Sequence, residues 1–262
     1  MTADQIRFDD GAGYEQYMGV WSQLAGASFL DWLDPRPGLA WLDVGCGNGA
    51  FTELIVNRCA PASVDGVDPS DGQLAFARTR PSSRTAVFQQ GDAMALPYPA
   101  DRFDVAVMPL VIFFVPDPAR GVGEMARVVR PGGLCTAYAW DMEGGGFPYA
   151  ALHAEVRELG IPVPSAPSPE ASRLDTMATL WDGAGFEDVG THTITVSRTF
   201  ADFADYWATI RKGPSVSRPL ETMTPATVAQ LQERLRRRVP ADASGRITYT
   251  ARANAVRGRV PA

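Results

Sequence analysis

The segment Leu39–Phe51 constrains the fold most strongly, because it joins a buried strand to a glycine-rich turn and a helix. Residues 39–44 form an apolar run typical of a strand inside a parallel sheet. Gly45, Gly47 and Gly49 follow at alternate positions, and a helical pattern begins immediately after them. Glycines in such a turn let the backbone bend sharply and let a ligand approach it closely. The segment therefore predicts a ligand site at the carboxyl edge of a parallel sheet.

The residue that precedes the turn bears on the nature of the ligand. The glycines by themselves also fit the dinucleotide pattern G-x-G-x-x-G/A. Asp43 lies two residues before the first glycine, where a carboxylate would repel a pyrophosphate, which needs bare N–H groups and the positive end of a helix. The same carboxylate suits a cationic ligand such as S-adenosylmethionine. Asp43 could instead only brace the loop through hydrogen bonds, and this alternative stays open.

Two further acids follow the next two expected strands. Asp68 ends a strand over 63–67, about 20 residues past the glycines, where an acid can hold both hydroxyls of a ribose. NAD enzymes share that feature. Asp92 follows a strand over 86–90 and could accept a hydrogen bond from an adenine amino group, which a dinucleotide site does not require. Strands over 103–108 and 134–138 complete this half, with a helix that ends at Arg130 between them.

With these pieces in order, the chain resembles the class I S-adenosylmethionine-dependent methyltransferases, and most closely the branch that contains the ubiquinone and menaquinone biosynthesis enzymes. The motifs that carry the resemblance span residues 39–140 and are Leu42–Gly49, Gly66–Ser70, Gly91–Pro97, Phe103-Asp104 and Glu124–Gly133. The resemblance implies a Rossmann-like, doubly wound, mostly parallel sheet of seven strands, whose last strand runs antiparallel between the fifth and the sixth. It also implies methyl transfer from S-adenosyl-L-methionine to a small molecule by in-line displacement, leaving S-adenosyl-L-homocysteine.

The resemblance and the spacing together assign residues to the expected site. The expected cofactor-binding residues are Tyr14, Asp43, Gly45, Cys46, Gly47, Asp68, Pro69, Asp92, Ala93 and Pro109. The expected acceptor-binding residues, which could equally be ordinary core, are Tyr17, Phe113, Trp140 and Trp207. His153, which we expect at the surface, and Asp141 are weak candidates for a base, and we expect no metal. The chain departs from the family pattern at Ile112–Phe114, where a histidine pair is common, and this removes a ready base and makes the site more apolar.

Some acceptors are disfavoured by the residues present. The positions after the fourth strand, 108–111, read Met-Pro-Leu-Val and cannot hydrogen-bond a target amino group as adenine-N6 and glutamine methyltransferases do. The chain has no cluster of acids for a catechol-type metal site. Its three cysteines lie in a loop, a helix and a strand, which disfavours arsenic methylation. A small apolar or aromatic metabolite is the remaining expectation.

Composition indicates one globular domain, with 45% hydrophobic and 21% charged residues. We expect a single methyltransferase domain over 1–262, made of an N-terminal lid helix (1–34), a cofactor-binding core (35–140) and an acceptor side (141–262) with a helical insertion at about 200–245. The N-terminal residues do not read as a signal or transit peptide, no apolar run approaches a membrane span, and we expect a cytoplasmic location.

The net charge of −6 conceals a basic C-terminal part, since residues 198–262 carry 12 basic and 5 acidic side chains. The arginines at the end of a helix over 225–238 suit the helix dipole, and those after Arg246 alternate with apolar residues as in a strand. Nucleic-acid binding is therefore not expected. Two alternatives to a methyltransferase remain, a NAD-type oxidoreductase and a cofactor-binding relative that does not methylate. The sequence leaves the acceptor and the oligomeric state unknown.

Overall fold

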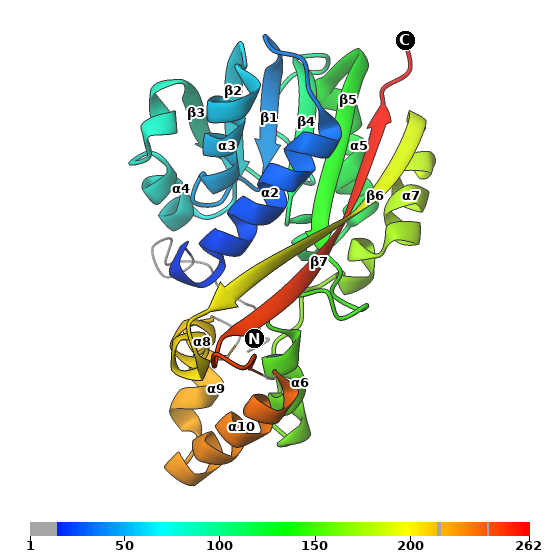
Figure 1. Ribbon diagram of the computed structural model, residues 1–262. Coiled ribbons are helices and arrows are strands. Elements are labelled where there is room, and N and C mark those ends of the chain that lie inside the picture. Colours follow the sequence, from blue (N-terminus) through cyan, green and yellow to red (C-terminus); the bar gives the residue numbers. More distant parts are fainter. Residues whose placement is uncertain (1–14, 214–215, 240) are drawn as a thin grey trace.

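The computed structural model describes residues 15–213, 216–239 and 241–262, and it contains one seven-stranded sheet (Figure 1). The strand order is β3-β2-β1-β4-β5-β7-β6. Strands β1 to β5 pair in parallel, and β7 is antiparallel to both of its neighbours. The order and the antiparallel last strand confirm the expected doubly wound fold. The strands are β1 (Ala40–Val44), β2 (Ser63–Asp68), β3 (Ala86–Gln90), β4 (Phe103–Pro109), β5 (Val129–Trp140), β6 (Glu187–Phe200) and β7 (Ile247–Arg259).

Helices cover both faces of the sheet. The π-helical turn η1 (Glu15–Gly19) leads into α2 (Val20–Leu33), which packs with α3 (Ala50–Cys59) on one face, whereas α5 (Pro118–Val128) and α7 (Leu174–Gly183) pack on the other (Figure 1). Strand β1 is buried along almost its whole length between these layers, which explains its uninterrupted apolar run. The remaining α-helix of this part is α4 (Asp71–Ala77), and the 3₁₀ turns are η2 (Pro81–Arg84), η3 (Ile112–Phe114) and η4 (Pro169–Ser172).

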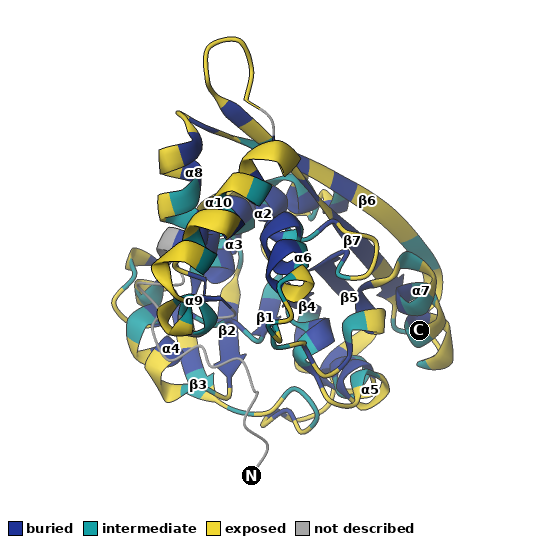
Figure 2. Cartoon of the chain, turned by 90° about the horizontal axis from the view of Figure 1, so that it is seen from below, coloured by how far each residue is buried: buried dark blue, intermediate teal, exposed yellow. Residues whose placement is uncertain are grey.

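Four helices lie beyond the carboxyl ends of β1 to β5, and α8 and α10 among them correspond to the inserted pair of helices that the sequence predicts (Figure 1). We call them the distal helices; they are α6 (Ala150–Glu158), α8 (Phe203–Ile210), α9 (Ser217–Thr222) and α10 (Pro225–Arg238). Strands β6 and β7 extend past the edge of the sheet to reach them, and their exposed outer sides alternate with buried residues (Figure 2). Helix α9 was not expected. The helix expected to end at Arg130 ends at Val128, because β5 already begins at Val129.

Six arginines of the basic C-terminal part form ion pairs with other described residues of the chain. Arg234 and Arg238 of α10 both bind Glu155 of α6, and Arg252 of β7 binds Asp141. Arg246 and Arg237 pair with acids on their own segments. Arg234, Arg238 and Arg252 therefore balance acidic residues of the preceding part of the chain, which supports the structural interpretation of the charge asymmetry.

Candidate functional site

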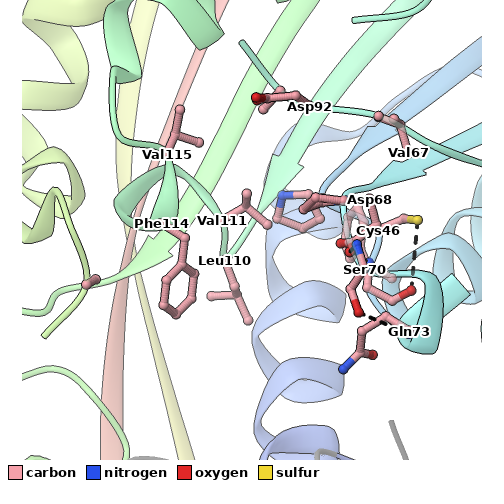
Figure 3. A pocket seen from close by; sticks show the side chains of 18 of the residues that line it. Cys46, Val67, Asp68, Ser70, Gln73, Asp92, Leu110, Val111, Phe114 and Val115 are labelled. Atoms are coloured by element: carbon pink, nitrogen blue, oxygen red, sulfur yellow. Dashed lines mark hydrogen bonds between the residues drawn. The ribbon is translucent and has the colours of Figure 1, made fainter. Parts of the chain in front are cut away.

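A cavity of about 520 Å³ opens at the carboxyl ends of the central strands (Figure 3). Most of its wall comes from the segments that follow four neighbouring strands, β1, β2, β3 and β4. Parallel strands end at the same edge, so four separate sequence motifs meet at one place. One side of the cavity carries Asp68, Ser70 and Gln73, and the opposite side carries Leu110 and Phe114 (Figure 3).

The glycine turn after β1 has the backbone that its composition predicts. Gly45, Gly47 and Gly49 all have positive φ angles, of 74°, 52° and 78°. A Cβ atom on Gly45 would come within 2.5 Å of the Val111 side chain, so this position is closed by packing. A Cβ atom on Gly47 would meet only the Gln73 Oε1 atom, at 3.9 Å, and would occupy the cavity. A ligand can therefore approach the backbone at Gly47.

The backbone amides of this turn already donate hydrogen bonds within the protein. Gly45 and Cys46 both donate to the Val67 carbonyl, and Gly49 donates to the Cys46 carbonyl. The Gly47 N–H donates to Asp68, and the Ala50 N–H donates to the Asn48 side chain at 3.2 Å. A pyrophosphate needs such N–H groups unpaired and pointing toward it. Five of the six amides at Gly45–Ala50 are thus already paired, which disfavours a dinucleotide.

Asp68 at the end of β2 is fixed as a hydrogen-bond acceptor inside the cavity. One carboxylate oxygen accepts the Gly47 N–H and the other accepts the Ser70 N–H, both at 2.9 Å. The side chain is 9% exposed and lines the cavity. Burial raises its pKa, although the two backbone N–H groups oppose this shift. Each oxygen retains a lone pair, so the carboxylate can accept two neighbouring hydroxyl groups of a ligand.

Eight of the ten expected cofactor-binding residues line this cavity. They are Gly45, Cys46, Gly47, Asp68, Pro69, Asp92, Ala93 and Pro109. Asp92 is exposed, and its Oδ1 accepts the Met94 N–H at 2.8 Å, which shapes the turn after β3. Burial raises the pKa of the Cys46 thiol well above its usual range, so Cys46 contributes shape rather than reactivity. Tyr14 lies outside the described residues.

The sequence predicts that Asp43 faces a cationic ligand, but in the structure its side chain lies elsewhere. Its side chain is fully buried, it does not line the cavity, and its Oδ2 accepts a hydrogen bond from Thr52 Oγ1 at 2.6 Å. Its Oδ1 has no hydrogen-bond partner among the described residues. Burial raises its pKa from 3.8 to about 7. Asp43 therefore lies beneath the glycine turn and joins β1 to α3, because its position on the strand directs the side chain into the helix layer.

The other side of the cavity is apolar and is formed largely by the segment that follows β4. Leu110 has a φ of +60°, an uncommon backbone conformation for a leucine, and its side chain points into the cavity (Figure 3). Phe114 and Val115 continue this wall. The segment 165–167 completes it, held in place by hydrogen bonds from Ser168 to the Phe113 and Val115 carbonyls.

None of the four expected acceptor-binding residues lines the described cavity. Tyr17 is buried and stacks on Tyr149, and Phe113 is buried behind Phe114. Trp140 is buried against Trp21. Trp207 on α8 is half-buried. The cavity as it stands therefore does not include these four side chains.

The two weak candidates for a base lie away from the cavity. Asp141 forms an ion pair with Arg252 and accepts the Gly144 N–H, so it fixes the turn after β5. His153 is not at the surface as expected but only 8% exposed, against the Phe147 ring. Burial lowers the pKa of His153 to about 4, because the charged imidazole would be poorly solvated there. Neither residue lines the cavity.

Several lining residues were missing from the sequence-based assignment. Ser22 of α2, Gln73 of α4 and the segment 165–167 all line the cavity. Gln73 follows the N-cap Ser70, which accepts the Gln73 N–H, and this capping signal after β2 could have identified it. Ser22 and 165–167 reach the site only through tertiary packing and carry no local signal. Within the part of the chain that is described, no group of His, Cys, Asp or Glu could hold a metal ion, and no helix is long and apolar enough to cross a membrane.

The fold and the site together define a class of protein. Residues 42–137, which contain β1 to β5 up to Ala137, match the family model described as a methyltransferase domain. This core of the chain therefore matches a methyltransferase domain, and the strand order of the sheet agrees with the match.

Curated relatives resemble only this core. The chain is 42% identical over 93 residues to 2-methyl-6-phytyl-1,4-hydroquinone methyltransferase 2 of Oryza sativa subsp. japonica, covering 36% of this chain and 27% of that protein. It is 40% identical over 103 residues to the demethylmenaquinone methyltransferase of Symbiobacterium thermophilum (37% and 41%). It is 35% identical over 133 residues to the ubiquinone biosynthesis O-methyltransferase of Pseudomonas paraeruginosa (48% and 56%). The chain thus spans between about a quarter and just over half of the length of these relatives.

Solved structures share the fold over almost the whole chain. The YcgJ protein of Bacillus subtilis has a TM-score of 0.61 at 17% identity, covering 91% of this chain and 98% of that one. The phosphoethanolamine N-methyltransferase 2 of Haemonchus contortus, solved with S-adenosyl-L-methionine, has a TM-score of 0.59 at 16% identity, covering 95% and 56%. A 4+2 cyclase, SpnF, has a TM-score of 0.51 at 19% identity, covering 96% and 86%. The same fold thus occurs in proteins named for different reactions.

Proposed function

We propose that this chain binds S-adenosyl-L-methionine and transfers its methyl group to a small, largely apolar or aromatic acceptor. The observation that carries the proposal is the pairing of Gly47 and Asp68 at one cavity wall. Gly47 leaves room for a ligand next to the backbone, and Asp68 presents two positioned acceptor oxygens beside it. A ribose with two neighbouring hydroxyls fits this pair.

The charge of the cavity suits a cation. Asp68 and Asp92 are the charged side chains among its described lining residues, and both are negative. S-adenosyl-L-methionine carries an ammonium and a sulfonium group and no phosphate. The amides of the glycine turn disfavour NADH, because its pyrophosphate needs N–H groups that are not already hydrogen-bonded within the protein. We therefore favour the methyltransferase over the oxidoreductase interpretation.

The residues that line the cavity would each have a role in this reaction. When bound, the cofactor supplies an electrophilic methyl group whose departure leaves the neutral S-adenosyl-L-homocysteine. Asp68 and the glycine turn would hold the nucleoside, and the turn at Asp92 would bound the adenine. Leu110 and Phe114 would exclude water from the reacting atoms, which prevents wasteful hydrolysis. Holding the acceptor in line with the methyl group at about 3–3.5 Å supplies most of the rate enhancement in such a site.

The same proposal assigns a role to each of three segments of the chain. Residues 35–140 would form the cofactor half, and 141–262 would supply most of the acceptor half, with 1–34 covering the site. Segment 165–167 lines the cavity opposite the cofactor side and supports this division. The acceptor would be a small molecule rather than a nucleic acid, because much of the basic C-terminal part is engaged in ion pairs.

Transfer of a labelled methyl group tests this proposal. The protein would be incubated with S-adenosyl-L-methionine labelled at the methyl carbon and a metabolite extract separated by polarity. Appearance of label in an apolar or aromatic fraction is expected, and it should disappear with the Asp68→Ala variant. Cofactor binding without label in any fraction would indicate the non-methylating alternative instead.

A further inference from the structure

Strand β6 is an edge strand of the sheet, and at 14 residues it is also the longest strand. It pairs with β7 on one side only, and it lies at the rim of the molecule, outside β7 (Figure 2). In an antiparallel pair, every second residue directs its backbone N–H and C=O away from the neighbouring strand. No described residue is hydrogen-bonded to these outward groups of β6. The edge is therefore open along its length.

The outer edge of β6 lacks most of the features that keep edge strands apart. Proteins protect a long edge with lysines, prolines, a bulge or a covering segment. Strand β6 contains neither lysine nor proline. Its register with β7 is irregular only between Glu187 and Gly190, so the ladder from Gly190 to Phe200 is regular. A regular, unpaired edge of this kind is a template for a further strand.

The exposed face of β6 carries hydroxyl side chains at alternate positions. We call them the hydroxyl column; they are Thr191, Thr193, Thr195, Ser197 and Thr199. Two of them show how the column acts across an antiparallel ladder, since Ser197 and Thr199 share hydrogen bonds with Thr250 and Thr248 of β7, both at 2.9 Å. A hydroxyl both donates and accepts, so the column can also pair with a copy of itself.

The first three hydroxyls of the column have no such partner on β7. Thr191, Thr193 and Thr195 lie opposite residues without a hydroxyl group, namely Val256, Asn254 and Arg252. Their hydroxyls make no hydrogen bond to another described residue. These three residues are also exposed. The middle of β6 thus presents three neighbouring hydroxyls to whatever lies against the open edge.

The charges of β6 suit antiparallel pairing with a second copy of the same strand. Its beginning carries the exposed acids Glu187 and Asp188, and Arg198 lies near its end. When two copies run antiparallel, the acidic beginning of each lies beside the arginine of the other. The register that brings Arg198 beside Asp188 is centred on Thr193. Opposite charges at both ends of the pair would therefore fix the same register.

We propose that β6 is a dimer interface, and that its partner is β6 of a second copy, paired antiparallel about a two-fold axis at Thr193. In this register Thr193 faces its own counterpart and Thr191 faces Thr195, so the hydroxyls that β7 leaves unpaired meet one another. Such a contact is isologous and closes as a dimer. Because β6 runs parallel to β5, the carboxyl edges of the two sheets point in opposite directions and both cavities stay clear of the interface.

The oligomeric state of the full chain tests this proposal. Sedimentation over protein concentrations into the high micromolar range should show a reversible monomer–dimer equilibrium for the wild type. Thr193→Lys places two like charges directly opposite each other and should weaken the association at least about ten-fold. Thr250→Lys is the matched control, because Thr250 is exposed on the same face but lies on β7, inside the edge. It should leave the association unchanged.

A disulfide test reports on the register. Directly opposite residues of an antiparallel pair have Cα atoms about 4.5–5.5 Å apart, which a disulfide can span. Thr193→Cys should therefore give a covalent dimer on mild oxidation, whereas Thr250→Cys should stay free of cross-links. The three native cysteines are buried and should not interfere. Melting temperatures of the variants check that each of them is folded.

Three results would overturn the interface. The first is a wild type that remains monomeric at every concentration. The second is a dimer that persists equally in Thr193→Lys and Thr250→Lys, because the copies would then associate through another surface. The third is the absence of a covalent dimer in folded Thr193→Cys, which would exclude pairing of β6 centred on this residue.

Discussion

Asp68 shows how one side chain organises two loops and a candidate ligand site. Its two carboxylate oxygens tie the turn after β1 to the start of α4 through the Gly47 and Ser70 N–H groups. The same oxygens lie at the cavity wall. A carboxylate positioned by the backbone in this way does not have to reorganise when a ligand binds, so little affinity is lost to ordering it.

The first prediction concerns Asp68. Asp68→Ala removes charge-assisted hydrogen bonds worth about 1.5–3 kcal/mol each, so affinity for S-adenosyl-L-homocysteine should fall at least ten-fold in a calorimetric titration. Asp71→Ala is the control, because Asp71 is an exposed carboxylate nearby on α4 and does not line the cavity. Equal affinities of the two variants would remove Asp68 from the ligand site.

The second prediction concerns the buried Asp43. Burial raises its pKa from 3.8 to about 7, so its contribution to folding is fully present below about pH 4 and is lost as the pH rises through 7. Asp43→Asn lacks this titration. The free energy of unfolding of the wild type, measured relative to Asp43→Asn, should therefore decrease between pH 4 and 7, by at most about 4 kcal/mol. Parallel stability curves for the two proteins would show that Asp43 titrates normally.

At the scale of elements, the turn between β1 and α3 contains glycines with two different roles. Gly45 is closed in by the Val111 side chain, whereas Gly47 leaves room for a ligand beside the backbone. Gly47→Val should abolish binding of S-adenosyl-L-homocysteine, because the new side chain would fill the cavity beside Gln73. Gly38→Val is a matched control, since Gly38 has a φ of +78° and open space around it, so backbone strain is common to both variants. Normal binding in Gly47→Val, measured by calorimetry, would mean that the ligand lies elsewhere.

The contact between α6 and α10 depends on one buried acid. Burial alone would raise the pKa of Glu155, but hydrogen bonds from Arg234 and Arg238 lower it, so its stabilisation is lost as the pH falls. Glu155→Ala should lower the free energy of unfolding by about 1–3 kcal/mol in a denaturant titration. Glu233→Ala breaks an exposed pair with Arg237 and should change it by less than about 0.5 kcal/mol. Equal losses in both variants would contradict a special role for Glu155.

The sequence predicts elements with strong local signals and misses those made by packing. The strand and turn motifs at residues 39–51 and 86–93 appear where their periodicity and glycines place them, and the antiparallel place of the last strand between the fifth and the sixth is confirmed. Helix α9 and the extended start of β5 carry no comparable pattern. In β5, Pro131 to Gly133 resemble a helix stop, yet β5 continues through them beside an irregular register with β4.

The residues of the candidate site likewise fall into those with a local sequence signal and those placed only by packing. Eight lining residues in or beside the turns after β1 to β4 were predicted, because each turn follows a recognisable strand. The expected acceptor residues do not line the cavity, since an aromatic side chain at helical spacing looks the same whether it packs in a core or against a ligand. Asp43 differs because a motif gives the position of a carboxylate along a strand but not the layer into which its side chain points.

At the scale of the whole molecule, the sheet gathers the predicted cofactor side at one edge, and β6 and β7 carry the distal helices beyond that edge (Figure 1). Ser22 of α2 and Tyr138 of β5 complete the wall of the cavity at this edge. Residues that lie far apart in the sequence therefore meet at one site.

Calorimetric titration with S-adenosyl-L-homocysteine, with NADH as the comparison, tests the central claim most directly. The paired amides of the glycine turn and the acidic cavity predict saturable binding of S-adenosyl-L-homocysteine and none of NADH. Binding of NADH alone would contradict the account, because it would require the amides at Gly45–Ala50 to be free for a pyrophosphate.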